Sequence, residues 1–237
     1  MLFFSRKHEL LKTPLFEGFK DYHSHILPAV DDGVKSLDES LTVLEYFEQL
    51  KVAEVILTPH VMAGINEGSN DVLSTYQTIC EAYKGDIKLS LASEYMLDTN
   101  FPARFAEGAR MLEGNSILVE TSYFSAPNNV DELLFEVCCS GCKPVIAHPE
   151  RYLYMENKDY HKLQEKDYAF QLNLLSFSDI YGPQVTKNTM YLLEQGLYNV
   201  IGTDLHRLST FKSCISQIKL STKNIDRLLE LKGNRLL

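Results

Sequence analysis

The stretch "FKDYHSHILPAVDDGVKSLDESLTVLEYFEQLKVAEVILTPH", residues 19–60, contains two candidate strands with a helix between them. The runs 19–23 and 53–59 are short, apolar and β-branched or aromatic, as strands are. Apolar residues recur between them at helical spacing: Leu37, Leu41, Leu44 and Phe47. Ser36 and Glu39 have the spacing of a capping box, which predicts where this helix begins. A strand, a helix and a second strand in this order are typical of parallel strands joined by a crossover helix.

The same alternation continues along the whole chain. The candidate strands are 19–23, 53–59, 87–93, 116–121, 143–148, 168–174 and 198–203. Further helices are predicted near 70–84, 128–140, 184–195 and 222–232. About seven strands with helices between them predict an α/β fold, either a barrel or an open doubly wound sheet. No linker or low-complexity segment divides the chain, so we expect a single domain over residues 1–237.

Composition and charge exclude several classes of protein. With 45% hydrophobic residues the chain can bury a large core, and its net charge of −9 disfavours nucleic-acid binding, which needs a basic face. No apolar run approaches the roughly 20 residues of a membrane span. The start "MLFFSRKHEL" does not resemble a secretory signal, so we expect a cytoplasmic protein without membrane insertion. Leu2, Phe3 and Phe4 either pack on their own domain or dock on another chain or a membrane surface, and the oligomeric state stays open.

The five cysteines are too few for a disulfide scaffold. Cys139 and Cys142 have the CxxC spacing of a metal site, but the helical pattern ends at Gly141. We therefore expect Cys138 and Cys139 to be small core residues at a helix C-terminus. A thiol-based phosphatase needs an arginine six residues after its cysteine, and no cysteine of this chain has one.

Side chains that commonly bind metals follow most of the candidate strands. The first strand carries Asp21, His23 and His25 at alternate positions, which face one side of an extended segment. Later strands end in a further set of such residues: His60, Glu94, Glu120, His148, Glu150, Asp204 and His206. The carboxyl ends of parallel strands gather on one rim, so these side chains are expected to meet there. Their number exceeds the needs of one ion, which predicts at least two metal ions.

Several individual assignments stay open at this point. Asp21 is either a ligand or a carboxylate that orients His23 or His25. Asp31 and Asp32 either shape the turn before Gly33 or bind metal, and we favour Asp32 as a ligand. The remaining histidines, His8 and His161, do not follow a strand in this way and are expected to be surface or packing residues.

The motifs at these strand ends carry a family likeness. The strings "DYHSH", "VDDG", "TPH", "SEY", "VETSY", "IAHPERY" and "GTDLH" occur in this order between about Gly18 and His206. Together they resemble the polymerase and histidinol phosphatase (PHP) superfamily. Within it, they resemble the bacterial metal-dependent tyrosine-protein phosphatases of capsule and exopolysaccharide synthesis. The resemblance implies a distorted, TIM-barrel-like (β/α) barrel, preceded here by an N-terminal extension over residues 1–17.

The resemblance also implies a metal centre of two or three ions, with Mn²⁺ expected and Fe, Zn, Co or Mg as alternatives. Carried over by matching motifs, its ligands would be His23, His25, Asp32, His60, Glu94, Glu120, His148, Asp204 and His206. Arg151 resembles the family's phosphate-contacting arginine, although a surface salt bridge to a nearby acid is the alternative. The family's further arginine after the "DxH" motif has no clear counterpart, and Arg207 or Lys212 is the candidate.

The expected reaction is hydrolysis of a phosphomonoester by a metal-activated hydroxide, with His60 or a metal-bound water as general acid. The expected substrate is a phosphotyrosine protein, by resemblance an autophosphorylated bacterial tyrosine kinase of polysaccharide synthesis. Tyr123 and Phe124 offer aromatic faces for a phosphotyrosine ring, or are core residues. The alternatives are a small-molecule phosphatase acting on histidinol phosphate or a sugar phosphate, and a non-catalytic metal-binding module.

Overall fold

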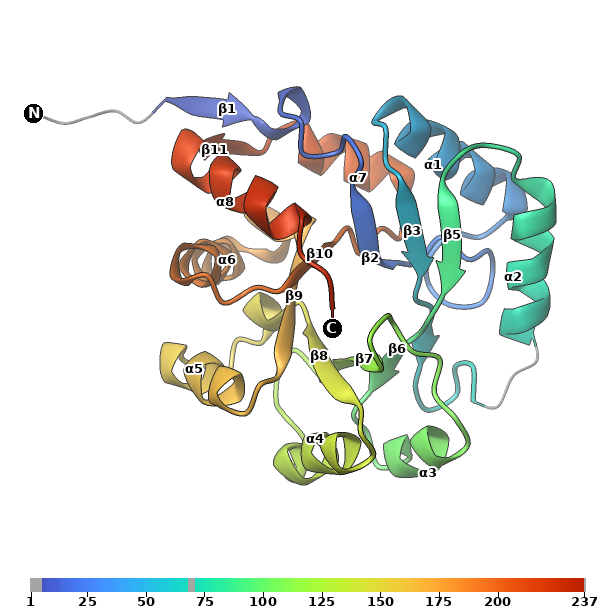
Figure 1. Ribbon diagram of the computed structural model, residues 1–237, viewed down its shortest axis with the longest axis vertical. Coiled ribbons are helices and arrows are strands. Elements are labelled where there is room, and N and C mark those ends of the chain that lie inside the picture. The colour runs from blue at the N-terminus through green and yellow to red at the C-terminus, as the bar shows by residue number, and fades with distance from the viewer. Residues whose placement is uncertain (1–5, 68–70, 237) are drawn as a thin grey trace, which may run out of the picture.

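The computed structural model describes residues 6–67 and 71–236. Two parallel sheets form its centre (Figure 1). The three-stranded sheet has the order β2 (Lys20–Ser24), β3 (Glu54–Leu57) and β5 (Lys88–Leu91). The six-stranded sheet has the order β10 (Val200–Gly202), β9 (Ala169–Asn173), β8 (Lys143–Ala147), β7 (Ser116–Glu120), β6 (Glu94–Met96) and β4 (His60–Val61).

The two sheets join into one barrel. β3 continues into β4 after Pro59, and β5 continues into β6 after Ser93, so each of these bent strands passes from one sheet to the other. At the opposite seam, the Asp204 amide donates to the His23 carbonyl at 2.8 Å and the His25 amide donates to the Leu205 carbonyl at 3.0 Å. The predicted fold class is therefore confirmed, and each of the seven predicted strands is present.

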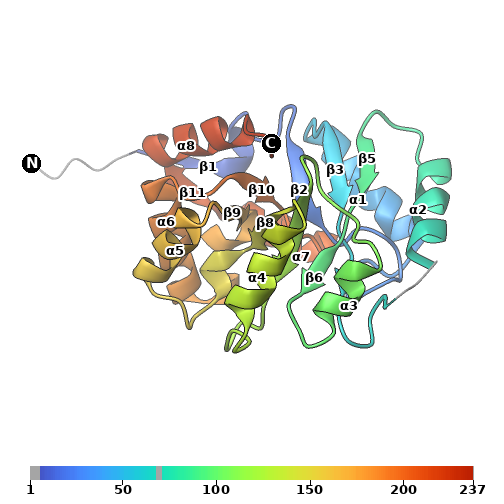
Figure 2. The same cartoon turned by 60° about the horizontal axis from the view of Figure 1, so that its bottom comes forward.

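Helices surround the strands in a ring, as Figures 1 and 2 show. The five predicted helices are α1 (Leu37–Gln49), α2 (Asp71–Ala82), α4 (Val130–Cys139), α6 (Pro183–Gln195) and α8 (Thr222–Lys232). The prediction missed the short helices α3 (Phe101–Ala106), α5 (Asn157–Glu165) and α7 (Leu208–Ile215). Single-turn 3₁₀ helices are η1 (Leu10–Lys12), η2 (Pro149–Arg151), η3 (Leu174–Phe177) and η4 (Asp179–Tyr181). Ser36 caps α1 as predicted, accepting a hydrogen bond from the Glu39 amide.

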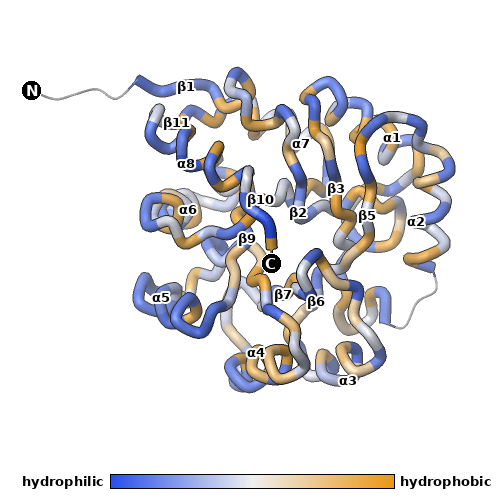
Figure 3. Tube along the Cα trace, viewed as in Figure 1, coloured by the Kyte–Doolittle hydropathy of each residue, from blue (hydrophilic) through white to orange (hydrophobic). Residues whose placement is uncertain are grey.

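Two clusters of buried apolar residues hold the barrel together. The larger lies between the strands and the helices, and the smaller combines residues from six strands with Ala92, Leu112 and Leu236. Its strand members are Tyr22, Ile56, Leu118, Val145, Ala147, Ala169 and Val200. Residues from strands all around the barrel meet in this cluster, so it is the barrel interior. Figure 3 shows hydrophobic stretches along β3 and β8, whereas β2 carries hydrophilic residues.

The N-terminal extension packs against the C-terminal part of the chain. β1 (Lys7–Glu9) pairs antiparallel with β11 (Lys219–Ser221), and Leu10, Leu15 and Phe16 are buried. The alternatives for Leu2, Phe3 and Phe4 concern residues outside the described ranges. No helix in the described ranges has the length and apolar composition to cross a membrane.

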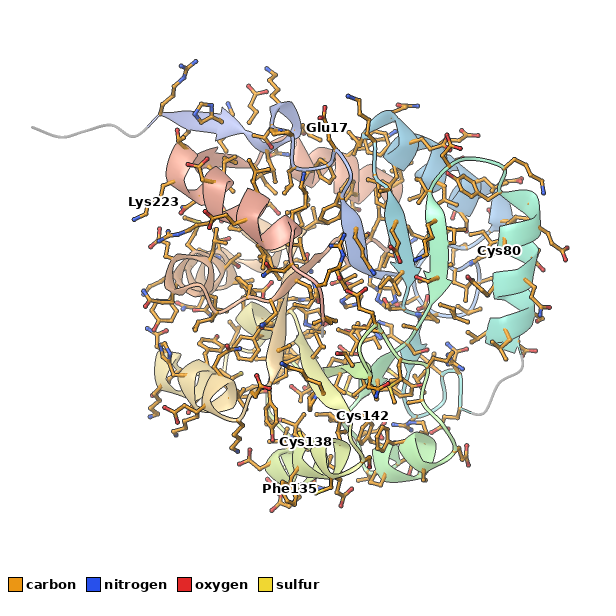
Figure 4. All side chains as sticks on the ribbon, viewed as in Figure 1. Glu17, Cys80, Phe135, Cys138, Cys142 and Lys223 are labelled. Carbon is orange, nitrogen blue, oxygen red and sulfur yellow. The ribbon has the colours of Figure 1, made fainter. Side chains whose placement is uncertain are left out.

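The prediction for the cysteines was wrong in one respect. The helix α4 does end at Cys139, with Gly141 in the left-handed conformation (φ 76°). Cys138 and Cys139 are exposed rather than buried, because the inner face of α4 consists of Leu133, Leu134 and Val137. Figure 4 labels Phe135 and Cys138 on this helix, at the edge of the molecule. No cysteine of the described residues belongs to a group of side chains that could hold a metal.

The seam between β2 and β10 depends on one buried carboxylate. Asp21 accepts hydrogen bonds from the Thr203 amide at 2.7 Å and the Thr203 hydroxyl at 2.6 Å, and both side chains are inaccessible to solvent. Thr203→Val keeps the shape and removes the hydroxyl, leaving one carboxylate oxygen without its partner. We expect urea denaturation to show a loss of about 1–3 kcal/mol in unfolding free energy.

Thr42→Val is the matched control for this experiment, since the Thr42 hydroxyl donates to a carbonyl on the exposed face of α1. A Thr203→Val protein as stable as the Thr42→Val protein would show that the seam does not need this bond.

Candidate metal centre

The carboxyl ends of the strands bring all nine predicted ligand residues into one cluster. Their donor atoms form four overlapping groups, each with atoms within 4.8 Å of one another. The groups are His25, Asp32, His60 and His206; His23, His25 and Asp204; His23, Glu94 and His148; and His60, Glu94 and Glu120. Shared members connect the four groups, so the cluster is continuous and spans more than one candidate ion position.

Glu94 lies at the centre of the cluster and is fully buried. Its Oε2 atom is 3.0 Å from His60 Nδ1, 3.2 Å from His23 Nε2 and 3.3 Å from His25 Nε2. Its Oε1 atom is 2.9 Å from His148 Nε2. One carboxylate therefore contacts imidazoles that come from three different strand ends.

The outer end of the cluster is open to solvent. Asp32 Oδ1 lies 3.2 Å from His206 Nε2 and 3.6 Å from His60 Nε2, and the Asp32 side chain is 70% exposed. The Asp32 carboxylate therefore marks the side from which a ligand can approach.

Three buried atoms of the group His60, Glu94 and Glu120 have no hydrogen-bond partner: His60 Nδ1, Glu94 Oε2 and Glu120 Oε1. The Nδ1 atom of His148, another cluster residue, has none either. His60 Nδ1 is 3.0 Å from each of the two carboxylate oxygens. Buried polar atoms without partners are costly, and a shared cation satisfies all three at once. Imidazole and carboxylate also suit divalent transition metals. These residues therefore fit a metal centre.

The pKa values reflect the same crowding of charge. Burial lowers the pKa of His60, but Glu94 and Glu120 outweigh burial and raise it to about 12. Burial and repulsion from Glu94 raise the pKa of Glu120 to about 7. Burial also opposes ionisation of Glu94, yet His23 and His60 hold its pKa well below the usual range. The charged form of these buried carboxylates is therefore stable only beside positive charge, which protons or metal ions provide.

The second nitrogen of three imidazoles is held by a hydrogen-bond partner. Gln171 Oε1 lies 2.8 Å from His23 Nδ1, and Asp31 Oδ2 lies 2.8 Å from His25 Nδ1. Asp31 also accepts from the amides of Gly33 and His60. Such contacts orient imidazoles for metal binding. The Nδ1 atom of His206 faces the Asp204 carbonyl at 2.9 Å.

The structure corrects the expectation for Asp21. The Asp21 carboxylate accepts hydrogen bonds from Thr203, and its contact with His23 is to the backbone amide rather than the ring. It therefore neither joins the cluster nor orients an imidazole. The reason is a register shift between β2 and β3 from Asp21 to Ser24, which breaks the simple alternation of faces. Asp31, for which the sequence leaves turn formation and metal binding open, accepts from the Gly33 amide in the turn and orients His25.

Two cluster residues have backbone angles that non-glycine residues seldom adopt. His148 has φ 33° and Asp204 has φ 50°, both just after a strand. This conformation is strained and turns the side chain out of the strand's alternation. Gly202 is needed for a steric reason, because a Cβ atom there would clash with His23 Cβ.

Arg151 lies beside the cluster. Its Nη1 donates to Asp204 Oδ2 at 2.7 Å, and its guanidinium carbon is 4.2 Å from the ring centroids of Tyr123 and Tyr181. The ion pair forms beneath a cavity rather than on the open surface, since only 15% of the Arg151 side chain is exposed. Burial opposes the Arg151 cation, but Asp204 outweighs burial and raises its pKa, so the guanidinium stays charged.

The cavity over the cluster has a volume of about 370 Å³. Arg151, His60, Asp32, Tyr123 and Ile180 are among its lining residues, and Arg207 also lines it. Phe124, at the neighbouring loop, is 87% exposed and is therefore not a core residue.

The other residues noted in the motifs lie elsewhere. Glu150 is fully buried and accepts from the Asn173 amide and the Tyr198 hydroxyl. His8 contacts Thr222, and His161 contacts Tyr191, both away from the cluster.

A parallel barrel that gathers imidazoles and carboxylates at the carboxyl ends of its strands defines the class of barrel metallohydrolases. Residues 19–230 match the family described as "Capsular polysaccharide synthesis, CpsB/CapC". The chain belongs to this CpsB/CapC family.

Named relatives agree with the family match. The chain is 30% identical over 200 residues to the tyrosine-protein phosphatase YwqE of Bacillus subtilis, covering 80% of this chain and 78% of that protein. It is 28% identical over 203 residues to the tyrosine-protein phosphatase CpsB of Streptococcus pneumoniae, covering 80% of this chain and 84% of that protein. A solved structure from a study of YwqE and CpsB, described as metal-dependent tyrosine phosphatases, superposes with a TM-score of 0.67 at 23% identity, covering 92% and 96%. The resemblance read from the motifs is thus confirmed.

Metal removal provides a test of the cluster. A metal that binds only the folded state stabilises it, by about 2.7 kcal/mol at a concentration 100 times its Kd. We expect Mn²⁺ to raise the unfolding temperature of chelator-treated protein, and Glu94→Gln to abolish most of that rise. Differential scanning calorimetry with and without Mn²⁺ measures it.

Glu45→Gln is the control, because Glu45 is an exposed residue of α1. Equal Mn²⁺-dependent shifts in both variants would show that Glu94 takes no part in metal binding.

Proposed function

We propose that the chain is a metal-dependent protein-tyrosine phosphatase. The observation that carries this proposal is the pairing of the buried His, Asp and Glu cluster with Arg151 in one cavity. The cluster suits metal ions, and a planar guanidinium suits phosphate. The relatives named as tyrosine-protein phosphatases support the same activity, since the chain aligns with most of their length.

The metal centre we propose holds two or three ions, with Mn²⁺ as the expected metal. Its ligands would be His23, His25, Asp32, His60, Glu94, Glu120, His148, Asp204 and His206, the members of the four overlapping groups. When bound, the ions would lower the pKa of coordinated water and bind phosphate oxygens.

The chain's own residues then bind and orient the phosphomonoester. In the proposed complex the Arg151 guanidinium donates to phosphate oxygens and stabilises the charge that spreads over them during transfer. His60 lines the cavity and offers Nε2 on the side of the exposed Asp32. For this role His60 would bind metal through Nδ1 and keep its proton on Nε2, a position that suits proton transfer to the departing phenolate oxygen.

The walls of the cavity favour an aromatic phosphoester. Tyr123 and Tyr181 line it together with Ile180, and these side chains offer apolar contact to a phenyl ring. Phe124 and Ile180 are exposed large apolar residues, which suit a peptide that continues beyond the ring. The alternative, a phosphatase of small molecules such as histidinol phosphate or a sugar phosphate, would leave these exposed apolar groups without a role.

The partner we propose is an autophosphorylated bacterial tyrosine kinase of polysaccharide synthesis. Support comes from the family description, which places the CpsB/CapC family in capsular polysaccharide synthesis. We further propose a cytoplasmic location and a single functional domain. All five cysteines are free, and three of them are exposed, as is typical in a reducing compartment.

Substrate selectivity and Arg151 test the proposed activity. We expect Mn²⁺-loaded protein to release phosphate from a phosphotyrosine peptide faster than from a phosphoserine peptide or histidinol phosphate. Arg151→Lys should lower kcat/KM about 10²–10³-fold, because lysine cannot reproduce the planar pair of donors. Phosphate release assays measure both effects.

Arg227→Lys on α8 is the control and should retain full activity. Faster release from histidinol phosphate would favour the small-molecule alternative, and no release from any substrate would favour the non-catalytic module.

A separate prediction concerns the second cationic group. Arg207 lines the cavity, whereas Lys212 Nζ lies 4.2 Å from the ring of Tyr46, and Lys212 is not among the lining residues. We therefore propose Arg207 as the second contact for the substrate's anionic groups. Arg207→Ala should raise KM about tenfold, within the range of a hydrogen bond to a charged group.

Lys212→Ala should leave KM unchanged in the same steady-state assay. The opposite result, with KM raised only by Lys212→Ala, would reverse the assignment.

A further inference from the structure

Arg151 is held by a set of contacts that the reaction scheme above does not explain. Its guanidinium carbon is 4.2 Å from the ring centroid of Tyr123 and 4.2 Å from that of Tyr181, so the cation lies between two aromatic rings. Tyr123 belongs to the loop between β7 and α4, and Tyr181 ends η4. Two segments nearly sixty residues apart thus converge on one side chain.

The rings control which way Arg151 faces. The Nη1 atom donates to Asp204 Oδ2, which also accepts from Asn173 Nδ2 at 2.8 Å. The two rings restrict the faces of the guanidinium, and Asp204 occupies part of one edge. No other described hydrogen bond engages the guanidinium, and Arg151 lines the cavity, so its remaining donors are available to a ligand there. A long side chain with several rotatable bonds is in this way confined before any ligand arrives, which lowers the entropy cost of binding.

Each tyrosine also has a support of its own. The Tyr123 ring packs near the rings of His148 and Tyr152, with centroid distances of 5.7 and 6.3 Å. Asn173 Nδ2 donates to the Tyr181 hydroxyl at 3.4 Å, a long contact, and the Tyr123 hydroxyl has no described hydrogen bond. The rings rather than the hydroxyls therefore carry the interaction with Arg151.

We propose that Tyr123 and Tyr181 are positioning residues that hold the Arg151 guanidinium between their rings with its free edge toward the phosphate of the substrate. The inference rests on the proposed function in that it takes a phosphate group as the ligand. The tyrosines need not touch the reacting atoms, and their effect passes through Arg151.

Inorganic phosphate is the probe, because it is the product of every phosphomonoesterase. Isothermal titration of Mn²⁺-loaded protein with phosphate should show binding about five- to tenfold weaker for Tyr123→Leu and for Tyr181→Leu, the range of one cation–π contact. Tyr123→Phe and Tyr181→Phe keep the ring and should bind within twofold of the original protein. Phosphate inhibition of peptide hydrolysis should rank the variants in the same order.

A double-mutant cycle separates positioning from general structure. In an Arg151→Ala background, Tyr123→Leu and Tyr181→Leu should weaken phosphate binding by less than twofold further. Tyr46→Leu is the matched control, since Tyr46 makes the same kind of contact with Lys212 outside the cavity and should not change phosphate affinity. Metal content and unfolding temperature should stay unchanged in the variants that lose affinity.

Three results would overturn the proposal. The first is an equal loss of phosphate affinity with and without Arg151, and the second is phosphate binding by the Phe variants as weak as that by the Leu variants. The third is a loss of phosphate affinity that follows loss of metal. Absence of phosphotyrosine hydrolysis in the original protein, with Arg151-dependent phosphate binding intact, would contradict the proposed function and leave this inference standing. Absence of phosphate binding to the original protein would contradict the inference.

Discussion

The arrangement of the site depends on one buried carboxylate, that of Glu94, and on the positive charge it requires. Glu94 is the first residue of β6, where the strand begun by β5 continues, and it contacts imidazoles from three other strand ends. A buried carboxylate without compensating charge is strongly unfavourable, so the strands around it must deliver cationic or cation-binding groups. The break after Ser93 is important because it lets the strand pass from the three-stranded sheet into the six-stranded sheet, where Glu94 joins the cluster.

Much of this arrangement could be predicted from the chain's own pattern. Each of the seven apolar runs is a strand, and the metal-binding residues at the ends of most of them mark the rim where the cluster forms. The rule works because parallel strands all end on the same side, whatever their order. The missed helices α3, α5 and α7 have six, nine and eight residues, too few turns for an apolar periodicity to emerge.

Other features depend on tertiary contacts and give only weak signals in the amino-acid sequence. Gln171 and Asn173 are polar residues at alternate positions of a strand that is otherwise apolar and fully buried, and that signal could have indicated a role at the site. The register shift between Asp21 and Ser24 leaves no such signal in the sequence, and neither do the positive φ angles of His148 and Asp204. Cys138 and Cys139 were misplaced because α4 buries only one narrow face, and sequence composition does not reveal which side of a helix end faces solvent.

The Asp204 carboxylate links two parts of the site. Its Oδ1 atom faces His23, His25 and His206, while its Oδ2 atom accepts from Arg151 and Asn173. One carboxylate is thus shared between the group that would hold cations and the group that would hold an anion. A ligand that draws hydrogen bonds from Arg151 changes the negative charge that Asp204 presents to the imidazoles. Thermodynamic linkage makes this influence mutual: anion and cation alter each other's affinity by the same factor, so the two halves of the site respond as one cooperative unit.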